Sequence, residues 1–320
     1  MNLSPLINIG AVVPDAEGAY QLLQNLFDAQ KIQEDIANIM SNSFTKVLHV
    51  GVGDIVLQFI EPLSKEGIWH THIQTKGSGI HHLTYYVENI DETIEVMKNE
   101  AGVEPLATLD IDWGKIFPSN DINPKANKIY IMNTMAEIGF HLALLEKPVD
   151  FPKTRYPTGL DKLIGDASTM LHIELTVDNN ERIYNFLHNL FGTELVEKEF
   201  SNMLDSDFMR IIHINLSNIV LQYCQPVEKV GTWYELLQKN GPYVHNLNWS
   251  VDDIKETVKK FKQEKIPKIF RSRLGPDSPP FYMMNTLDKL GFHLENGQAP
   301  KTEEGYEFTK NFLFIDFKKD

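Results

Sequence analysis

The first half of the chain alternates between two hydrophobic periodicities. Residues 7–13 (INIGAVV) repeat with period two, which predicts a strand, and residues 14–27 then follow the spacing of an amphipathic helix. Strands around a Gly53-Asp54 turn follow in residues 47–62. The same order begins again at Gly79 with a strand, a helix and further strands up to residue 146. We therefore predict two βαβββ units in this half.

The second half repeats the first. A shift of 164 residues aligns Val56-Leu57-Gln58 with Val220-Leu221-Gln222. Near the end of each half the shift falls to 152 residues, which aligns Met132-Asn133-Thr134 with Met284-Asn285-Thr286. Such self-similarity indicates an internal duplication with four βαβββ units in all. The predicted parts are a first domain at 1–147, a linker at 148–168, a second domain at 169–300 and a tail at 301–320.

Composition narrows the class of protein. The length of 320 residues suits two domains, and the hydrophobic fraction of 42% with 23% charged residues is typical of a globular chain. A net charge of -14 argues against nucleic acid or an anionic membrane as a partner. The single Cys224 excludes an intrachain disulfide and a multi-cysteine zinc site, and no apolar run reaches 18 residues. We expect a cytoplasmic protein.

The strands that open the later units each have one apolar and one polar face, because successive side chains point to opposite sides of a sheet. The polar side chains are His, Glu and Asn rather than Lys and Arg, which favours a concave, ligand-lined surface; a face exposed to bulk water remains the alternative. The polar sets are His172, Glu174 and Thr176 in the third unit, Asn246, Asn248 and Ser250 in the fourth, and His293 with Glu295 on the last strand.

Three segments resemble the vicinal oxygen chelate superfamily, which includes glyoxalases, bleomycin-resistance proteins, extradiol dioxygenases and methylmalonyl-CoA epimerases, and they look closest to its epimerase-like branch. They are Val56–Leu63, Gly77–Gly102 and Leu171–Gly192. The resemblance covers residues 5–147 and 169–297. It implies an α+β fold in which tandem pairs of βαβββ modules form two open barrels of mixed sheet with helices outside.

The resemblance also implies a divalent metal ion inside a barrel, with ligands on the first and last strands of each unit. Carried over to the second half, the ligand positions hold His172, Gln222 and Glu295, with Asn246 where the family usually has His. An asparagine offers only a neutral amide oxygen, which is a weaker ligand than imidazole for most transition metals. The ligand set does not choose among Co, Mn, Ni, Zn and Fe.

The first half departs further from the family's metal pattern. It keeps Gln58 and His82, but Asn8 stands where His is usual and Ala143 where the carboxylate is expected. We therefore expect a degenerate metal site in this half and a functional one in the second.

The implied activity is that of a metal-dependent isomerase, epimerase or lyase, acting through an enolate next to a carbonyl of a small organic acid or acyl thioester. Glu174 and Glu295 are the expected catalytic carboxylates. Candidates for substrate binding are Asn248, His293, and Arg271 with Arg273 on an expected loop at 270–280.

Two other functions remain open. The four-unit length suits an extradiol-type dioxygenase, although Asn246 replaces the second His that such an enzyme needs. The chain could instead bind or sequester a small molecule without catalysis. Because the duplication builds both barrels in one chain, either a monomer or a homodimer is compatible with the sequence.

Other recurring residues are expected to be structural. By strict alternation, His81 and His245 fall on the face opposite the predicted site, and we interpret them as packing residues. Trp69 and Trp233 recur after the closing strands of their units, where they are expected to anchor the connection to the next unit.

Overall fold

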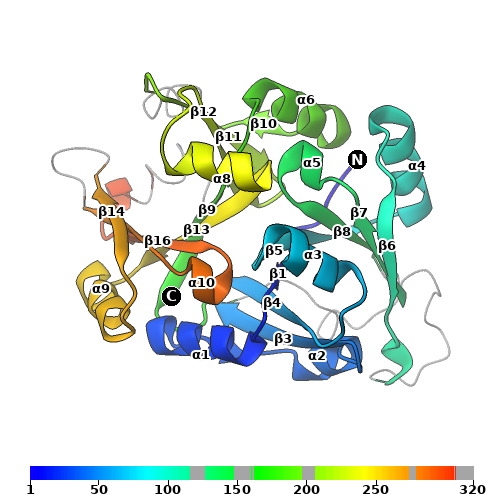
Figure 1. The fold of residues 1–320 in the computed structure, drawn as a ribbon, viewed down its shortest axis with the longest axis horizontal. Helices are drawn as coiled ribbons and strands as arrows, with labels where there is room; N and C mark the ends of the chain where they lie inside the picture. Colours follow the sequence, from blue (N-terminus) through cyan, green and yellow to red (C-terminus); the bar gives the residue numbers. More distant parts are fainter. Residues whose placement is uncertain are drawn as a thin grey trace.

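A computed structural model describes residues 1–115, 127–147, 160, 162–196, 206–273, 279–305 and 307 (Figure 1). These residues form two eight-stranded mixed sheets, one from each half of the chain. In the described part, no helix combines the length and the apolar character that crossing a membrane requires.

The first half contains the following elements in chain order: β1 (Asn8–Val12), α1 (Ala16–Phe27), β2 (Gln30–Lys31), α2 (Glu34–Met40), β3 (Thr45–Val52), β4 (Ile55–Pro62), α3 (Ile68–Lys76), β5 (Gly79–Val87), α4 (Ile90–Ala101), β6 (Pro105–Asp110), the 3-10 helix η1 (Trp113–Lys115), β7 (Lys128–Met132), α5 (Met135–Ile138) and β8 (His141–Glu146). The second half contains β9 (Ala167–Thr176), α6 (Asn180–Phe191), β10 (Glu194–Leu195), β11 (Met209–Leu216), β12 (Ile219–Pro226), α8 (Thr232–Asn240), β13 (Tyr243–Val251), α9 (Ile254–Gln263), β14 (Lys268–Ser272), β15 (Phe281–Met284), α10 (Leu287–Leu290) and β16 (His293–Gln298).

The strand order confirms the predicted units. The first sheet runs β2-β3-β4-β1-β5-β8-β7-β6 and the second runs β10-β11-β12-β9-β13-β16-β15-β14. In each unit the opening strand lies parallel to the unit's own last strand, and the two opening strands pair antiparallel at the centre of the sheet. The α+β class and the tandem duplication of open, mixed sheets are therefore as the sequence predicts.

The duplication extends to the ends of the helices. Asp15 caps α1 by accepting from Gly18 N at 2.9 Å, and Asn179 caps α6 by accepting from Arg182 N at 2.9 Å. Side-chain oxygens at this position satisfy backbone N–H groups that have no partner within the helix. The α6 helix ends at Gly192, whose φ of +64° lies in the left-handed region that glycine adopts without a steric penalty.

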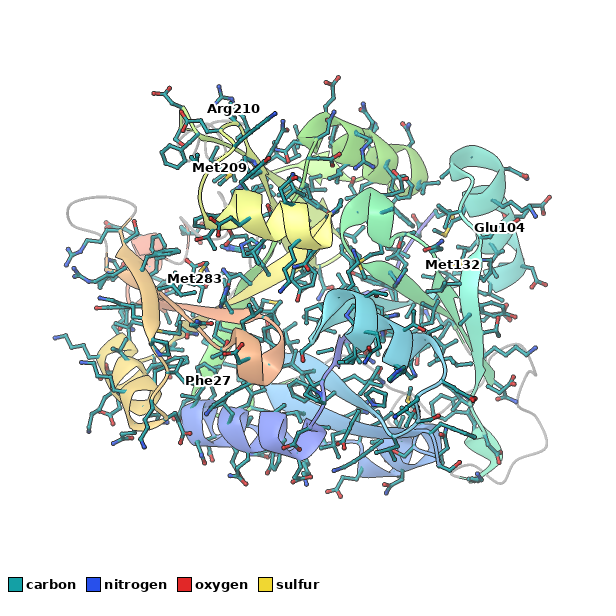
Figure 2. All side chains as sticks on the ribbon, in the orientation of Figure 1. Phe27, Glu104, Met132, Met209, Arg210 and Met283 are labelled. Carbon is teal, nitrogen blue, oxygen red and sulfur yellow. The ribbon has the colours of Figure 1, made fainter. Side chains whose placement is uncertain are left out.

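The apolar faces of the two sheets share one hydrophobic core. Ile9 and Leu83 of the first sheet belong to the same buried cluster as Ile173 and Leu247 of the second. Between α1 and α9, the rings of Phe27 and Phe261 meet edge to face with centroids 6.1 Å apart. Figure 2 labels Phe27 beside α1. Because the apolar faces meet in the middle, the polar faces point away from each other, and each half has its own concave interior.

Candidate metal centre

The predicted ligand positions lie side by side on the central strands of the second sheet. Glu174 of β9 is the register partner of Gln222 on β12 and of Asn246 on β13. One step along the strands, Asn248 pairs with His172 on β9 and with Glu295 on β16. Alternation therefore places all of these side chains on the same face, as the sequence predicts.

Three of these side chains form the most compact group of potential metal ligands. One ligand atom each from His172, Glu174 and Glu295 lies within 4.8 Å of the other two. Both carboxylates are buried, with 4% of Glu174 and 5% of Glu295 exposed. No other set of three His, Cys, Asp or Glu residues in the described part of the chain comes as close.

The side chain of Asn246 connects the two carboxylates. Its Nδ2 donates to Glu174 Oε2 at 2.9 Å and to Glu295 Oε2 at 2.6 Å. In this orientation the amide nitrogen donates to both acids. Asn246 therefore positions the two carboxylates and does not turn its oxygen toward a metal between them. An imidazole at this position could donate only one ring N–H to this pair.

Glu174 is also held from the opposite side. Its Oε1 accepts from Trp233 Nε1 at 2.9 Å, from the thiol of Cys224 at 3.3 Å, and lies 3.1 Å from His245 Nε2. One expectation from the sequence is wrong here: His245 faces the centre and not the opposite side. Trp233 belongs to α8, which connects the third and fourth units, and its indole ties that helix to Glu174 of β9.

A β-bulge explains the position of His245. The register between β13 and β9 shifts between Val244 and Asn246, so His245 is an extra residue in its strand. A bulge leaves one residue without a partner and breaks the alternation of side chains. His245 and Asn246 can therefore both reach Glu174, which strict alternation forbids. The same irregularity occurs beside His81 in the first sheet.

The two buried carboxylates differ in charge. Burial raises the pKa of Glu295 to about 8, and the neighbouring charge of Glu174 adds to this effect. Burial also acts to raise the pKa of Glu174, but His245, His172 and Asn246 outweigh it and hold that pKa well below its usual value. Like charges in one site push two pKa values apart. Without a cation, the pair therefore holds one proton at neutral pH, on Glu295.

The donor chemistry fits a divalent cation. Burial lowers the pKa of His172 to about 4, so its imidazole is neutral at pH 7 and keeps a lone pair for coordination. Two carboxylates and one neutral imidazole are common ligands of divalent transition metals. A cation would also compensate for burying Glu174 and Glu295 together, which is otherwise unfavourable.

These groups lie at the polar end of a cavity of about 680 Å³ in the second half. Most of its wall is apolar, with Phe208, Trp233, Phe270 and Phe281 as its aromatic members. The volume falls within the range of about 300–1,000 Å³ that is usual for small-molecule sites.

Gln222, a predicted ligand, lines the same cavity. Its Nε2 points to Cys224 Sγ at 3.8 Å, and its side chain also hydrogen-bonds to His213. Gln222 therefore lies beside the compact group, but the third member of that group, with His172 and Glu295, is Glu174. His213 was not predicted from the sequence, although it recurs as His49 at the 164-residue shift. Burial lowers the pKa of His213 to about 3.

The predicted substrate-binding residues lie at different distances from the centre. Asn248 lines the cavity, with Nδ2 3.4 Å from His172 Nε2 and a buried Oδ1 that has no hydrogen bond to a described residue. His293 is buried on β16 beside Asn246, its register partner, and is not part of the cavity wall.

The two arginines border the outer edge of the sheet. Arg271 was expected on a loop, but β14 extends to Ser272 and makes Arg271 part of an edge strand. Its Nε donates to Tyr282 Oη at 3.2 Å. Tyr282 and Glu295 lie on opposite faces of the sheet, because Tyr282 pairs with Asn296 and Glu295 pairs with Met283. Arg271 nevertheless lines the larger cavity together with Glu295. Arg273 is exposed just beyond β14.

The described part of the first half lacks the acidic centre. Gly10 occupies the position of Glu174, and Ala143 that of Glu295. The ring of His82 fills the space beside Gly10, because a Cβ added there would lie 2.1 Å from His82 Cε1. Ala143 belongs to a second buried apolar cluster, with Trp113 and Ile131, inside this barrel. The first sheet therefore brings no pair of carboxylates together.

Comparison with known proteins agrees with the fold. Residues 8–109 match the sequence profile of the Glyoxalase/Bleomycin resistance protein/Dioxygenase superfamily, and no curated protein sequence matches the chain. A triple mutant of 4-hydroxymandelate synthase from Streptomyces coelicolor is 12% identical, with a TM-score of 0.61 over 99% of each chain.

Two further solved structures are similar. A fusion of a xylose isomerase-like TIM barrel and 4-hydroxyphenylpyruvate dioxygenase is 12% identical, with a TM-score of 0.56 over 98% of this chain and 51% of that one. Methylmalonyl-CoA epimerase from Mycobacterium tuberculosis is 17% identical, with a TM-score of 0.35 over 42% of this chain and 91% of that one. The resemblance to the glyoxalase/bleomycin resistance/dioxygenase superfamily is confirmed for residues 8–109, and the whole chain shares its fold with 4-hydroxymandelate synthase.

Proposed function

We propose that the second half of the chain is a metal-dependent enzyme that acts next to a carbonyl group of a small organic acid or acyl thioester, as an isomerase, epimerase or lyase. The observation that carries this proposal is the meeting of His172, Glu174 and Glu295 at the end of a largely apolar cavity. In the described structure no lysine or arginine is bonded to either buried carboxylate. Such a pair is more compatible with a bound cation than with a pocket that holds only an organic ligand.

His172, Glu174 and Glu295 would hold the cation. Glu174 thus takes the place that the sequence assigned to Gln222 or Asn246, and Asn246 orients both acids through Nδ2. A divalent ion bound there would supply Lewis-acid polarisation of a substrate carbonyl. Co, Mn, Ni, Zn and Fe all accept such a donor set.

The two carboxylates differ in their freedom to move a proton. Glu174 is held by Trp233, His245, Cys224 and Asn246, which suits a fixed anion. Among the described residues, Glu295 accepts from Asn246 alone, through Oε2, which leaves Oε1 for the cation or for a proton. Burial raises the pKa of Glu295, so before a cation binds this carboxyl holds a proton more readily than Glu174 does.

The cavity supports the same interpretation. Its aromatic walls at Phe208, Phe270 and Phe281 would exclude water from the reacting end of a substrate. Water exclusion strengthens the electrostatic interactions of Glu174 and Glu295 with whatever they bind. The substrate therefore carries an apolar body in addition to its carbonyl group.

A dioxygenase is the second candidate. Three protein ligands at the end of an open cavity leave coordination positions for both a substrate and O₂, as in non-haem Fe(II) oxygenases. The fold also matches 4-hydroxymandelate synthase over nearly the whole chain. The set of one imidazole and two carboxylates departs from the usual two imidazoles and one carboxylate, which is why this function ranks second.

Metal analysis followed by two activity assays tests the proposal. Purified protein equilibrated with Mn, Co, Ni, Zn or Fe should retain about one ion per chain, and Glu174→Gln and Glu295→Gln should each lose it. Glu181→Gln, a change on the exposed surface of α6, is the control that should retain it. With metal bound, exchange of the α-proton of oxo acids and acyl thioesters in D₂O would support the isomerase class, and O₂ consumption would support the dioxygenase.

A folded protein that binds no metal and catalyses neither reaction would contradict both enzymatic proposals. It would favour the remaining alternative from the sequence, a protein that binds or sequesters a small molecule. Circular dichroism of each variant shows whether a loss of metal reflects the ligand change or unfolding.

A further inference from the structure

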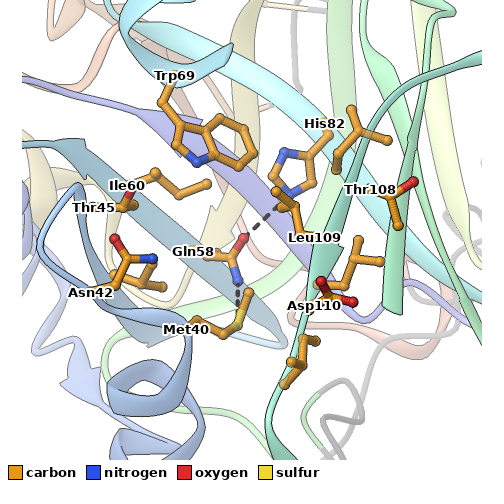
Figure 3. A pocket seen from close by; sticks show the side chains of 14 residues that line it. Met40, Asn42, Thr45, Gln58, Ile60, Trp69, His82, Thr108, Leu109 and Asp110 are labelled. Atoms are coloured by element: carbon orange, nitrogen blue, oxygen red, sulfur yellow. Dashed lines mark hydrogen bonds between the residues drawn. The ribbon is translucent and has the colours of Figure 1, made fainter. Parts of the chain in front are cut away.

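We propose that the first half of the chain binds a small, uncharged aromatic molecule with a hydrogen-bond acceptor, without any metal, inside its own sheet. A cavity of about 230 Å³ lies there (Figure 3). Gln58 and Trp69 line it, and the duplication relates them to Gln222 and Trp233 of the larger cavity in the second half. This site does not depend on the function proposed for the second half.

The size and walls of the cavity suit one aromatic ring. Met40, Ile60, Leu109 and Ile129 supply apolar surface, and the indole of Trp69 supplies an aromatic wall (Figure 3). An apolar cavity of about 150 Å³ is enough to hold benzene. The larger volume here therefore has room for a benzene ring with a short substituent.

The floor of the cavity is polar but neutral. Gln58 Nε2 donates to His49 Nε2 at 2.9 Å, and Gln58 Oε1 accepts from His82 Nε2 at 3.2 Å. The amide's own polarity sets these directions, because its nitrogen can only donate and its oxygen can only accept. Burial lowers the pKa of His82 to about 3 and that of His49 to about 4, so both rings are uncharged at pH 7.

The described lining of the cavity carries little charge. Asp110 is the one acidic residue among the described residues around the cavity, and it is exposed. Leu109 and Ile111, its neighbours in sequence, pack into the apolar cluster inside the barrel, so alternation turns the Asp110 side chain away from them. A charged ligand would lose its hydration without gaining a counter-charge, which is unfavourable.

Trp69 provides a hydrogen-bond donor that has no acceptor among the described residues. In the second half, Trp233 Nε1 donates to Glu174. The equivalent of Glu174 is Gly10, which has no side chain, and Trp69 Nε1 forms no hydrogen bond with a described residue. Figure 3 shows the indole at the wall of the cavity with its nitrogen on the side of Ile60 and Gln58. A hydrogen-bond acceptor on the ligand, such as a ketone oxygen, would pair with the Nε1–H of Trp69.

The cavity also differs from a second metal site. Gly10 and Ala143 replace both glutamates, and the ring of His82 occupies the space next to Gly10. The first half has thus kept a space at the same place in the sheet while losing the acidic ligands. A neutral ligand is what the remaining residues can accommodate.

Isothermal titration calorimetry of the full chain in the presence of a chelator tests this inference. Acetophenone is the probe, and benzoate, benzylamine and toluene are its anionic, cationic and acceptor-free counterparts. Acetophenone should bind, and benzoate and benzylamine should bind at least tenfold more weakly. Trp69→Phe should weaken acetophenone about fivefold, as the loss of one neutral hydrogen bond predicts, and leave toluene unchanged.

The duplication supplies the matched control. Trp233→Phe alters the equivalent position of the larger cavity and should leave the acetophenone binding that Trp69→Phe weakens unchanged. A second variant, Thr45→Phe, adds volume at the wall of the smaller cavity and should abolish binding. Equal binding of the charged probes, a weaker affinity in Trp233→Phe than in Trp69→Phe, or no binding of acetophenone to the unmodified chain would each overturn the inference. Thermal melts establish that every variant is folded.

Discussion

Replacing Glu295 by glutamine is expected to stabilise the metal-free protein at neutral pH. Burial and the charge of Glu174 raise the pKa of Glu295 from 4.5 to about 8. In the folded state this carboxyl therefore keeps a proton that the unfolded chain releases. Glutamine has nearly the shape of the protonated acid, cannot ionise, and can still accept from Asn246 through its amide oxygen.

The sign and size of the effect follow from linkage between proton binding and folding. Because the folded pKa lies above the unfolded one, the proton stabilises the folded state fully below pH 4.5, and this stabilisation is lost as the pH rises to about 8. At about 1.4 kcal/mol per pH unit, the unmodified protein loses several kcal/mol of stability between pH 4.5 and about pH 8. Glu295→Gln avoids this loss.

Urea unfolding with a chelator, at pH 5, 7 and 8, measures the difference. The variant should gain little at pH 5 and progressively more at pH 7 and 8. Adding the metal that the unmodified chain retains should make the unmodified protein the more stable of the two. A metal that binds only the folded state stabilises it, and the variant lacks one of the side chains that hold the metal. A difference between the two proteins that does not change with pH would refute the assignment of the shared proton to Glu295.

Three further predictions test other parts of the structure. His245→Ala removes a contact that holds Glu174, and should weaken metal affinity by about tenfold in a chelator competition; unchanged affinity would show that the contact is incidental. His82→Gln should reduce acid sensitivity: burial lowers the folded pKa of His82 to about 3, so the unfolded chain takes up the proton first and stability falls as the pH drops from 6.5 toward that value. Unfolding free energies at pH 7 and pH 5 give this slope, and equal slopes in both proteins would contradict it. Phe261→Ala should destabilise the chain by about 3–5 kcal/mol, in one urea transition for both halves; two separate transitions would contradict a shared core.

The structure also shows where alternation along a strand is a sufficient guide and where it fails. His172, Glu174 and Glu295 could be placed on one face because β9 and β16 are regular in that stretch. His245 was placed on the wrong face because a bulge interrupts β13 next to it. The His-Asn pair at 245 and 246 gave no local signal of a bulge, since it contains neither glycine nor proline.

The sequence alone did not identify which polar side chains form the compact group of potential metal ligands. Repeat positions nominated Gln222 and Asn246 beside His172 and Glu295, but Glu174 takes the third place in the compact group. Asn246 turns its amide nitrogen toward both acids, an orientation that depends on two strands meeting β13 from either side. Sequence separation alone cannot say which of several polar neighbours on a face will meet.

By itself, the sequence determined the duplication, the four βαβββ units and the polarity of the strand faces. These features depend on periodicities of two and 3.6 residues and on matching positions, which are local properties of the chain. Tertiary structure alone decided that both sheets share one core and that His245 and Trp233 reach Glu174. Those outcomes depend on strand register, bulges and side-chain directions, which are set only when strands far apart in the sequence pair.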